Sequence, residues 1–278
     1  MKLNEIKNLQ TFFLNVIYSN PEINVENFYS AQEFKYFHAD TFHRIQAYRE
    51  SFYARVSSVF SQTIFDLASL LFGKNFIEKY LVDYFYHNPT VLNMTDSVKN
   101  FGSFLESQEE MQYCPFVPDF VKFCYSIQEI LAATDPTSNF LPVNISSTEN
   151  IYLQKEHIIF NSQWPIFQMY NAAKELQETT EKDSNAEENL DNERETKLSH
   201  ITNNSEDVIL FKSQRWSLDV IVIPKEFSAI MNLLSKGKSL HYAIENSEID
   251  QENFNLEKFS QWISTLTKQN AFINQSIS

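Results

Sequence analysis

Hydrophobic residues recur at helical spacing through the first half of the chain. The pattern predicts six helices with short connections, and no segment of this half alternates as a strand does. The predicted helices cover about 3–19, 40–56, 61–72, 75–87, 95–107 and 118–131. Gly73 suits the position just past a helix end, and Asn88-Pro89 should end the helix before it. The first half therefore predicts an all-helical domain.

The last part of the chain has a different pattern. Val208–Phe211 and Leu218–Ile223 are β-branched runs separated by a short polar segment, which predicts two paired strands. Residues 158–160 are compatible with another short strand. Three short helices should follow, beginning at Pro224, Ser239 and Asn255. Two strands with three short helices predict a small α+β module that resembles a winged helix.

An acidic stretch separates the two patterns. Residues 174–207 contain eleven acidic and four basic residues and almost no apolar ones. Its first turns can extend the preceding helix, but the rest cannot bury enough surface to offset the entropy of ordering it. We therefore expect a mainly α protein with a helical domain over 1–173 (core 38–134), a flexible acidic tether over 174–207, and a small α+β domain over 208–278.

Composition excludes several classes of function. The net charge of −14 argues against a nucleic-acid ligand, because phosphate contacts need a basic surface. Three glycines are too few for a phosphate-cradling loop, and two cysteines are too few for a disulfide scaffold or a four-thiolate metal site. No apolar run approaches membrane-spanning length, so we expect a cytoplasmic protein without membrane contact.

Catalytic chemistry has little support in the sequence. His38, Asp40 and His43 form the only local cluster that suggests metal or acid–base chemistry, but histidines five residues apart do not share a helical face. A polar helix start explains them as well. We predict no catalytic residue and no metal site, and a free-standing enzyme using His38, His43 or His87 is the last of our hypotheses.

Two segments are candidates for binding. Arg44, Tyr48 and Arg49 lie on or beside one helical face, and arginine and tyrosine are favoured at protein interfaces. An internal salt bridge that ties this helix to its neighbours is an equally good explanation.

The second candidate is the strand run that includes Leu218, Val220, Ile221 and Val222. An edge strand can accept an extended peptide through main-chain hydrogen bonds. The alternative is that the strands only close the core of the module.

Several segments, taken in order, resemble one protein family. Arg44–Arg49 is similar to its R-x-x-x-Y-R helix, Phe65–Phe76 to its F-P…L-x-G-x-x-F stretch, Tyr84–Pro89 to its aromatic helix ending in proline, Phe101–Leu105 to its G-x-x-F-L, Pro115–Phe120 to its P-Y-L-x-D-L, and Ser162–Ile166 to its R-x-x-x-P-V turn. With the strand pair and the segment Leu233–Ala243, they resemble the HvfC/BufC/MbnC-type partner proteins. The resemblance covers about 40–170 and 208–273, with Asp66 in place of the usual proline and Cys124 where glutamate is common.

The resemblance implies a function. Proteins of this kind pair with a TIM-barrel enzyme that holds several non-haem irons and oxidatively rearranges cysteines of a ribosomally made precursor peptide. The helical domain docks on the barrel, and the C-terminal domain helps hold the leader of the precursor peptide. The resemblance thus implies a non-catalytic heterodimer subunit with no cofactor of its own, the iron lying in the partner enzyme.

A DNA-binding regulator that uses the winged-helix-like C-terminal domain is the alternative. Its recognition-helix candidates carry only the scattered lysines Lys236, Lys238, Lys258 and Lys268. This basic patch is thin for a DNA-binding surface, so the partner protein is the leading hypothesis.

Overall fold

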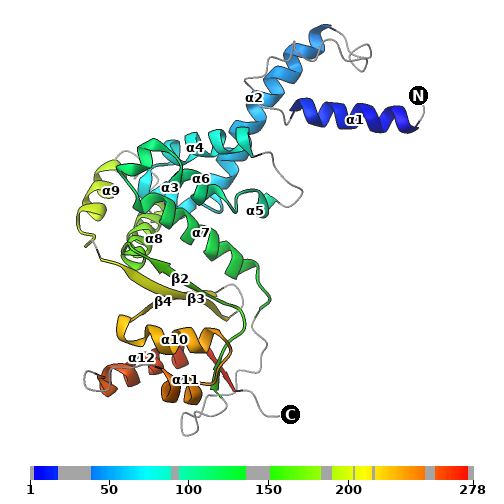
Figure 1. The fold of residues 1–278 in the computed structure, drawn as a ribbon. Coiled ribbons are helices and arrows are strands. Elements are labelled where there is room, and N and C mark those ends of the chain that lie inside the picture. The colour runs from blue at the N-terminus through cyan, green and yellow to red at the C-terminus, as the bar shows by residue number, and fades with distance from the viewer. Residues whose placement is uncertain are drawn as a thin grey trace. The chain divides into compact units, whose positions relative to one another are not determined.

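The structure is a computed structural model that describes residues 3–17, 39–88, 94–135, 151–182, 190–202, 204–214, 217–247 and 254–274. It is mainly helical, with small antiparallel sheets in the C-terminal part, which confirms this much of the predicted fold class (Figure 1). The chain divides into two compact units. One combines residues 1–122 and 176–194, and the other combines 123–175 and 195–278; we call them the helical unit and the sheet unit.

The helical unit is built from helices that mostly follow the predicted pattern. They are α1 (Leu3–Ile17), α2 (Ala39–Gln62), α3 (Asp66–Phe72), α4 (Lys74–His87), α5 (Met94–Ser97), α6 (Phe101–Glu106), a 3-10 turn η3 (Glu109–Gln112) and the start of α7 (Phe116–Ala132). The helix predicted over 95–107 is divided, because residues 98–100 form a turn between α5 and α6.

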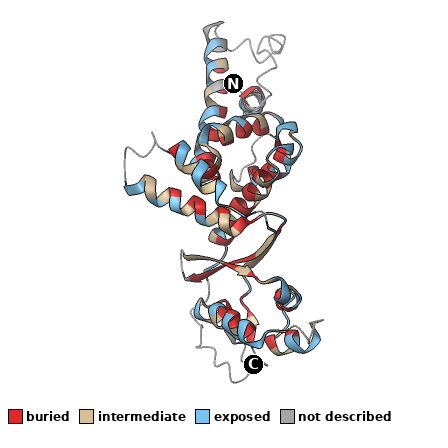
Figure 2. Cartoon of the chain, turned by 90° about the vertical axis from the view of Figure 1, so that its left-hand side faces the viewer, coloured by how far each residue is buried: buried red, intermediate tan, exposed pale blue. Residues whose placement is uncertain are grey.

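Aromatic side chains form the core of the helical unit. Phe65, Phe85 and Phe101 have no exposed surface, and Figure 2 shows such buried positions along the helices. The ring centroids of Phe65 and Phe101 lie 5.1 Å apart, and those of Phe60 and Phe85 lie 5.4 Å apart. Each buried ring contributes about 1.5–3 kcal/mol. The high phenylalanine content of the chain therefore serves packing.

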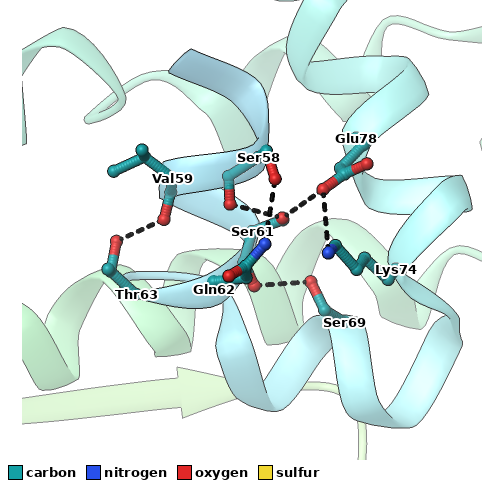
Figure 3. A network of polar contacts seen from close by, with 8 residues as sticks. All are labelled: Ser58, Val59, Ser61, Gln62, Thr63, Ser69, Lys74 and Glu78. Atoms are coloured by element: carbon teal, nitrogen blue, oxygen red, sulfur yellow. Dashed lines mark hydrogen bonds and ion pairs between the residues drawn. The ribbon is translucent and has the colours of Figure 1, made fainter. Parts of the chain in front are cut away.

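A tight turn and a polar network join α2, α3 and α4. Gly73 has φ +97° and its N–H donates to the Ser69 carbonyl at 3.0 Å, so it ends α3 as predicted. The Ser69 hydroxyl donates to the Ser61 carbonyl and the Ser61 hydroxyl to Glu78 Oε1, both at 2.8 Å (Figure 3). Lys74 lies 3.7 Å from the same carboxylate oxygen. These bonds satisfy polar groups at the junction of three helices.

The sheet unit contains every strand that the structure describes. Its elements are β1 (Ile151–Leu153), β2 (His157–Ser162), the start of α8 (Ile166–Lys182), β3 (Glu206–Gln214), β4 (Ser217–Ile223), a 3-10 turn η5 (Lys225–Phe227), α10 (Ser228–Ser235), α11 (Leu240–Asn246), α12 (Leu256–Lys268) and β5 (Phe272–Asn274). The strands form an antiparallel sheet in the order β2-β3-β4 and an antiparallel pair β1-β5. The strand pair β3–β4 was predicted, and β2 contains the residues 158–160 that were compatible with a short strand, whereas β1 and β5 were not predicted.

The central strand β3 is covered on both faces. Ile209 and Phe211 belong to a core shared with α10, α11 and α12, while the alternate residues Val208 and Leu210 are equally buried on the other face. On that second face the Phe123 ring of α7 lies 5.6 Å from the Phe160 ring of β2. Burial on both sides explains why the run from Val208 is continuously apolar.

Local capping chemistry starts the last two helices where the sequence predicts. The Ser239 hydroxyl accepts the Tyr242 N–H at 3.2 Å, and Asn255 Oδ1 accepts the Lys258 N–H at 2.9 Å. Each bond satisfies one of the main-chain donors that a helix N-terminus leaves without a partner.

The predicted tether over 174–207 requires correction, because much of it is regular structure. The helix α8 continues to Lys182, α9 spans Leu190–Ser199, and β3 begins at Glu206. Leu176 and Leu190 are buried. Arg194 Nε donates to the Leu70 carbonyl at 2.6 Å, near the end of α3 where a helix favours a cation. A few anchors thus order an acidic segment; residues 183–189 lie outside the described part.

The two units also follow a different division from the predicted domains. Residues 176–194 belong to the helical unit, and β2, which precedes residue 174, pairs with β3 in the sheet unit. Pairing between segments so distant in sequence leaves no local signal in the intervening stretch.

Candidate partner and peptide interfaces

The three residues predicted at a partner interface do not share one environment. Arg44 and Tyr48 are exposed on α2, and Tyr48 keeps 51% of its surface accessible. Arg49 is 0% exposed, and its Nη1 donates to Gln46 Oε1 at 3.3 Å. The burial of Arg49 favours the internal alternative for this residue. Arg44 and Tyr48 retain side chains that another protein can reach.

The exposed face of α2 extends further than the sequence motif indicates. Arg55 and Val59 are exposed, Val59 by 48%. Positions 44, 48, 55 and 59 fall on one side of a helix, so these four residues form a continuous strip that we call the α2 stripe. Arg55 and Val59 lie seven and eleven residues after Tyr48, and this helical spacing is the signal in the sequence that places them on the same face.

The α2 stripe carries positive charge on an acidic chain. Neither Arg44 nor Arg55 forms an ion pair with any described residue, and the chain as a whole has a net charge of −14. Two guanidinium groups beside an exposed tyrosine and valine combine charge with apolar contact area. Such a combination is typical of protein interfaces.

The predicted acceptor strand lies at an edge of the sheet. Among the described residues β4 pairs with β3 alone, so its other side carries main-chain groups without a strand partner. Leu218, Val220 and Val222 are half-buried, whereas Ile221 is only 8% exposed and belongs to the core. Of the four predicted peptide-binding residues, Ile221 is therefore the one whose side chain packs in the core.

One contact shows which main-chain groups of β4 face outward. The Trp262 indole of α12 donates to the Val222 carbonyl at 3.2 Å. Because N–H and C=O of one residue point to the same side of a strand and alternate along it, this contact indicates that Val220 and Leu218 also direct their main-chain groups outward. Sequence reasoning missed Trp262, which no local pattern relates to β4.

The two described histidines considered earlier lie on different helices, α2 and α4. His43 and His87 are exposed, and His87 Nδ1 lies 2.8 Å from the Asp83 carbonyl of its own helix; His38 lies outside the described residues. Cys124 is 1% exposed, and burial raises the pKa of the Cys114 thiol. No three histidine, cysteine, aspartate or glutamate side chains of the described ranges gather as a metal site.

Burial also shifts the pKa values of two side chains in the sheet unit. It raises the pKa of Tyr170, with the Asp219 and Cys124 side chains adding to the effect, and it lowers the pKa of His157.

No helix in the described part of the chain is long and apolar enough to cross a membrane.

No protein-family model matches the chain, and a search of curated proteins finds no similar sequence.

Proposed function

We propose that this protein is a non-catalytic partner subunit of a multinuclear non-haem iron TIM-barrel enzyme, and that it helps recruit the leader of a ribosomally made precursor peptide for oxidative cysteine modification. The iron is expected in the enzyme. The ordered series of family-like segments supports this proposal, and the α2 stripe is the structural observation that carries it. An exposed cationic and apolar helix face suits contact with another protein.

The sheet unit supports the second half of the proposal. Three antiparallel strands and the three short helices α10, α11 and α12 belong to a small α+β module, for which we propose a winged-helix-like role. Its edge strand β4 has half-buried side chains and outward main-chain groups, as strand addition by a peptide requires. We assign leader contact to Leu218, Val220 and Val222, with main-chain pairing at Leu218 and Val220, because the Val222 carbonyl already accepts the Trp262 indole N–H.

The docking role is tested by co-expression with a multinuclear non-haem iron TIM-barrel enzyme, to be sought among the neighbouring genes. We expect a stable 1:1 complex, and the double variant Arg44→Ala/Tyr48→Ala should weaken it tenfold or more, because arginine and tyrosine dominate binding energy when buried at an interface. Lys99→Ala removes an exposed cation outside the α2 stripe and should leave the affinity unchanged. Separate elution of the two wild-type proteins at micromolar concentration contradicts the proposal.

The peptide role is tested at Val220. Val220→Pro removes one outward N–H without removing a core side chain, and it should reduce leader affinity measured by fluorescence anisotropy at least fivefold. Ile221 is unsuitable, since its replacement would also open the core. Thermal unfolding of Val220→Pro must stay close to that of the wild type for the comparison to hold, and undiminished leader affinity in the folded variant contradicts the assignment of β4.

The DNA-binding alternative has weaker support. Lys258 pairs with Glu226, and Lys238 lies 5.3 Å from the centre of the Tyr242 ring, so two of the four candidate lysines already have local partners. Salt-sensitive retention of random duplex DNA by the purified chain would favour that alternative.

A further inference from the structure

The face of the three-stranded sheet that meets α10 contains a small cavity at one end. Its volume is about 300 Å³, and its walls include Ile159 and Asn161 of β2, Asp207 of β3, and Met231 and Asn232 of α10. Asn161 and Asn232 are exposed, which places the mouth of the cavity between β2 and α10. A cavity at the lower end of the size range of ligand pockets has room for one side chain or a small ligand.

The cavity carries one charge. Among the described residues of its wall, Asp207 alone is ionisable, and Asn161, which pairs with Asp207 across the sheet, places an amide beside the carboxylate. Among the described residues Asp207 has no ion pair. Ile159 and Met231 supply apolar wall. A carboxylate with neutral amides and apolar surface suits the stem and cationic head of an arginine or lysine side chain.

The strand β2 indicates that this cation belongs to a peptide. Within the described ranges β2 pairs only with β3, so its outer edge is open. An extended chain that adds to this edge sends alternate side chains to the face where the cavity lies. We propose that the β2 edge binds an extended peptide and that the cavity takes one of its basic side chains against Asp207. The inference rests on the proposed function only in taking a peptide as the ligand. The proposed site is at β2, on the opposite edge of the sheet from β4.

The test uses the full chain and the peptide acetyl-Thr-Val-Arg-Val-Thr-amide, followed by ¹⁵N–¹H NMR spectra. We expect the side-chain amide signals of Asn161 and Asn232 to shift on titration. Replacing arginine by citrulline keeps the shape and removes the charge, so that peptide should bind about tenfold more weakly. Asp207→Asn should abolish the preference for arginine.

A matched variant separates the cavity from the general acidity of the chain. Asp219→Asn makes the same change on β4, outside the cavity wall, and should preserve the preference for arginine. Equal affinity for the arginine and citrulline peptides, or an undiminished preference in Asp207→Asn, overturns the proposal. Agmatine binding as tightly as the arginine peptide overturns the role of the β2 edge. The assay needs no enzyme, so its failure is distinct from a failure of the enzyme complex to form.

Discussion

His157 illustrates how one partly buried residue links stability to pH. It lies on β2, where burial lowers the pKa of its imidazole, and the contact of Nδ1 with the Gln154 carbonyl at 2.6 Å opposes this shift only in part. In the unfolded chain the imidazole regains the ordinary histidine pKa of 6.5. Between that value and the lower folded pKa, the unfolded state binds more protons than the folded state.

We therefore predict that the free energy of unfolding falls as pH decreases below 6.5, down to the folded pKa of His157. His157→Gln should reduce this dependence, whereas His200→Gln, at an exposed site, should retain it. Urea titrations between pH 7.5 and about 5.5 measure the effect above the range in which carboxylates titrate. Equal slopes in the wild type and His157→Gln would contradict the role of His157.

Adjacent residues can have opposite environments, which limits what a sequence motif reveals. Tyr48 is half exposed and Arg49 is fully buried, although both fit an interface motif. One residue turns a helix by about 100°, which is enough to move a side chain from the surface to the core. Distinguishing the two requires knowing which face of α2 the neighbouring helices cover.

At the scale of elements, the contact between α6 and α7 depends on the absence of one side chain. A Cβ at Gly102 would lie 2.4 Å from Lys122 Cγ and 3.1 Å from the Pro118 carbonyl oxygen. The lysine can move aside, but the carbonyl belongs to the main chain of α7. The close approach of the two helices therefore favours glycine at this position.

We predict that Gly102→Ala lowers the free energy of unfolding by about 1–2 kcal/mol, because overpacking of 1–3 kcal/mol outweighs a helix-propensity gain of up to 1 kcal/mol. Gly237→Ala is the matched control. Its Cβ would meet nothing within 4 Å, but its φ of +75° makes alanine costly by about 1 kcal/mol through backbone strain alone. Adding Lys122→Ala should restore part of the stability lost in Gly102→Ala and none of that lost in Gly237→Ala. A Gly102→Ala protein as stable as the wild type would contradict the steric argument.

The elements that the sequence predicts are those with local chemistry. Ser239, Asn255 and Gly73 mark helix ends through bonds to residues three or four positions away. The strands β1 and β5 contain three residues each and pair across more than a hundred positions, so no window of sequence contains their signal. The helix α9 is acidic, and its order depends on contacts such as that of Arg194 with Leu70.

At the scale of the whole molecule, three helices contribute to both units. α7, α8 and α9 each cross a boundary between the two units, so the chain passes from one unit to the other inside regular structure. Charge and hydropathy cannot show such boundaries, since they mark linkers and these junctions are helical. The mainly helical class was predictable from periodicity, whereas the division of the chain depends on long-range pairing.

This arrangement predicts how fragments of the chain behave. Residues 208–278 contain β4 and the last three helices but lack β1, β2 and the first residues of β3. Ile151 and Leu153 of β1 are 1% and 6% exposed in the core, and β1 is the pairing partner of β5. A fragment without them leaves core side chains in water, leaves β3 paired with β4 alone and leaves β5 without a partner strand. Fragments of this size have little stability to lose.

We expect residues 208–278 to show no cooperative thermal transition and a red-shifted tryptophan emission, because Trp262 would lose the environment in which it is 7% exposed. Residues 116–278 contain the whole sheet unit and should unfold cooperatively, with tryptophan emission close to that of the full chain. If 208–278 folds as well as 116–278, then β1 and β2 are additions to an independent module rather than parts of its core. If only the longer fragment unfolds cooperatively, then the sheet needs the strands that precede α8. Any peptide that binds at β4 or at β2 then depends on those strands as well.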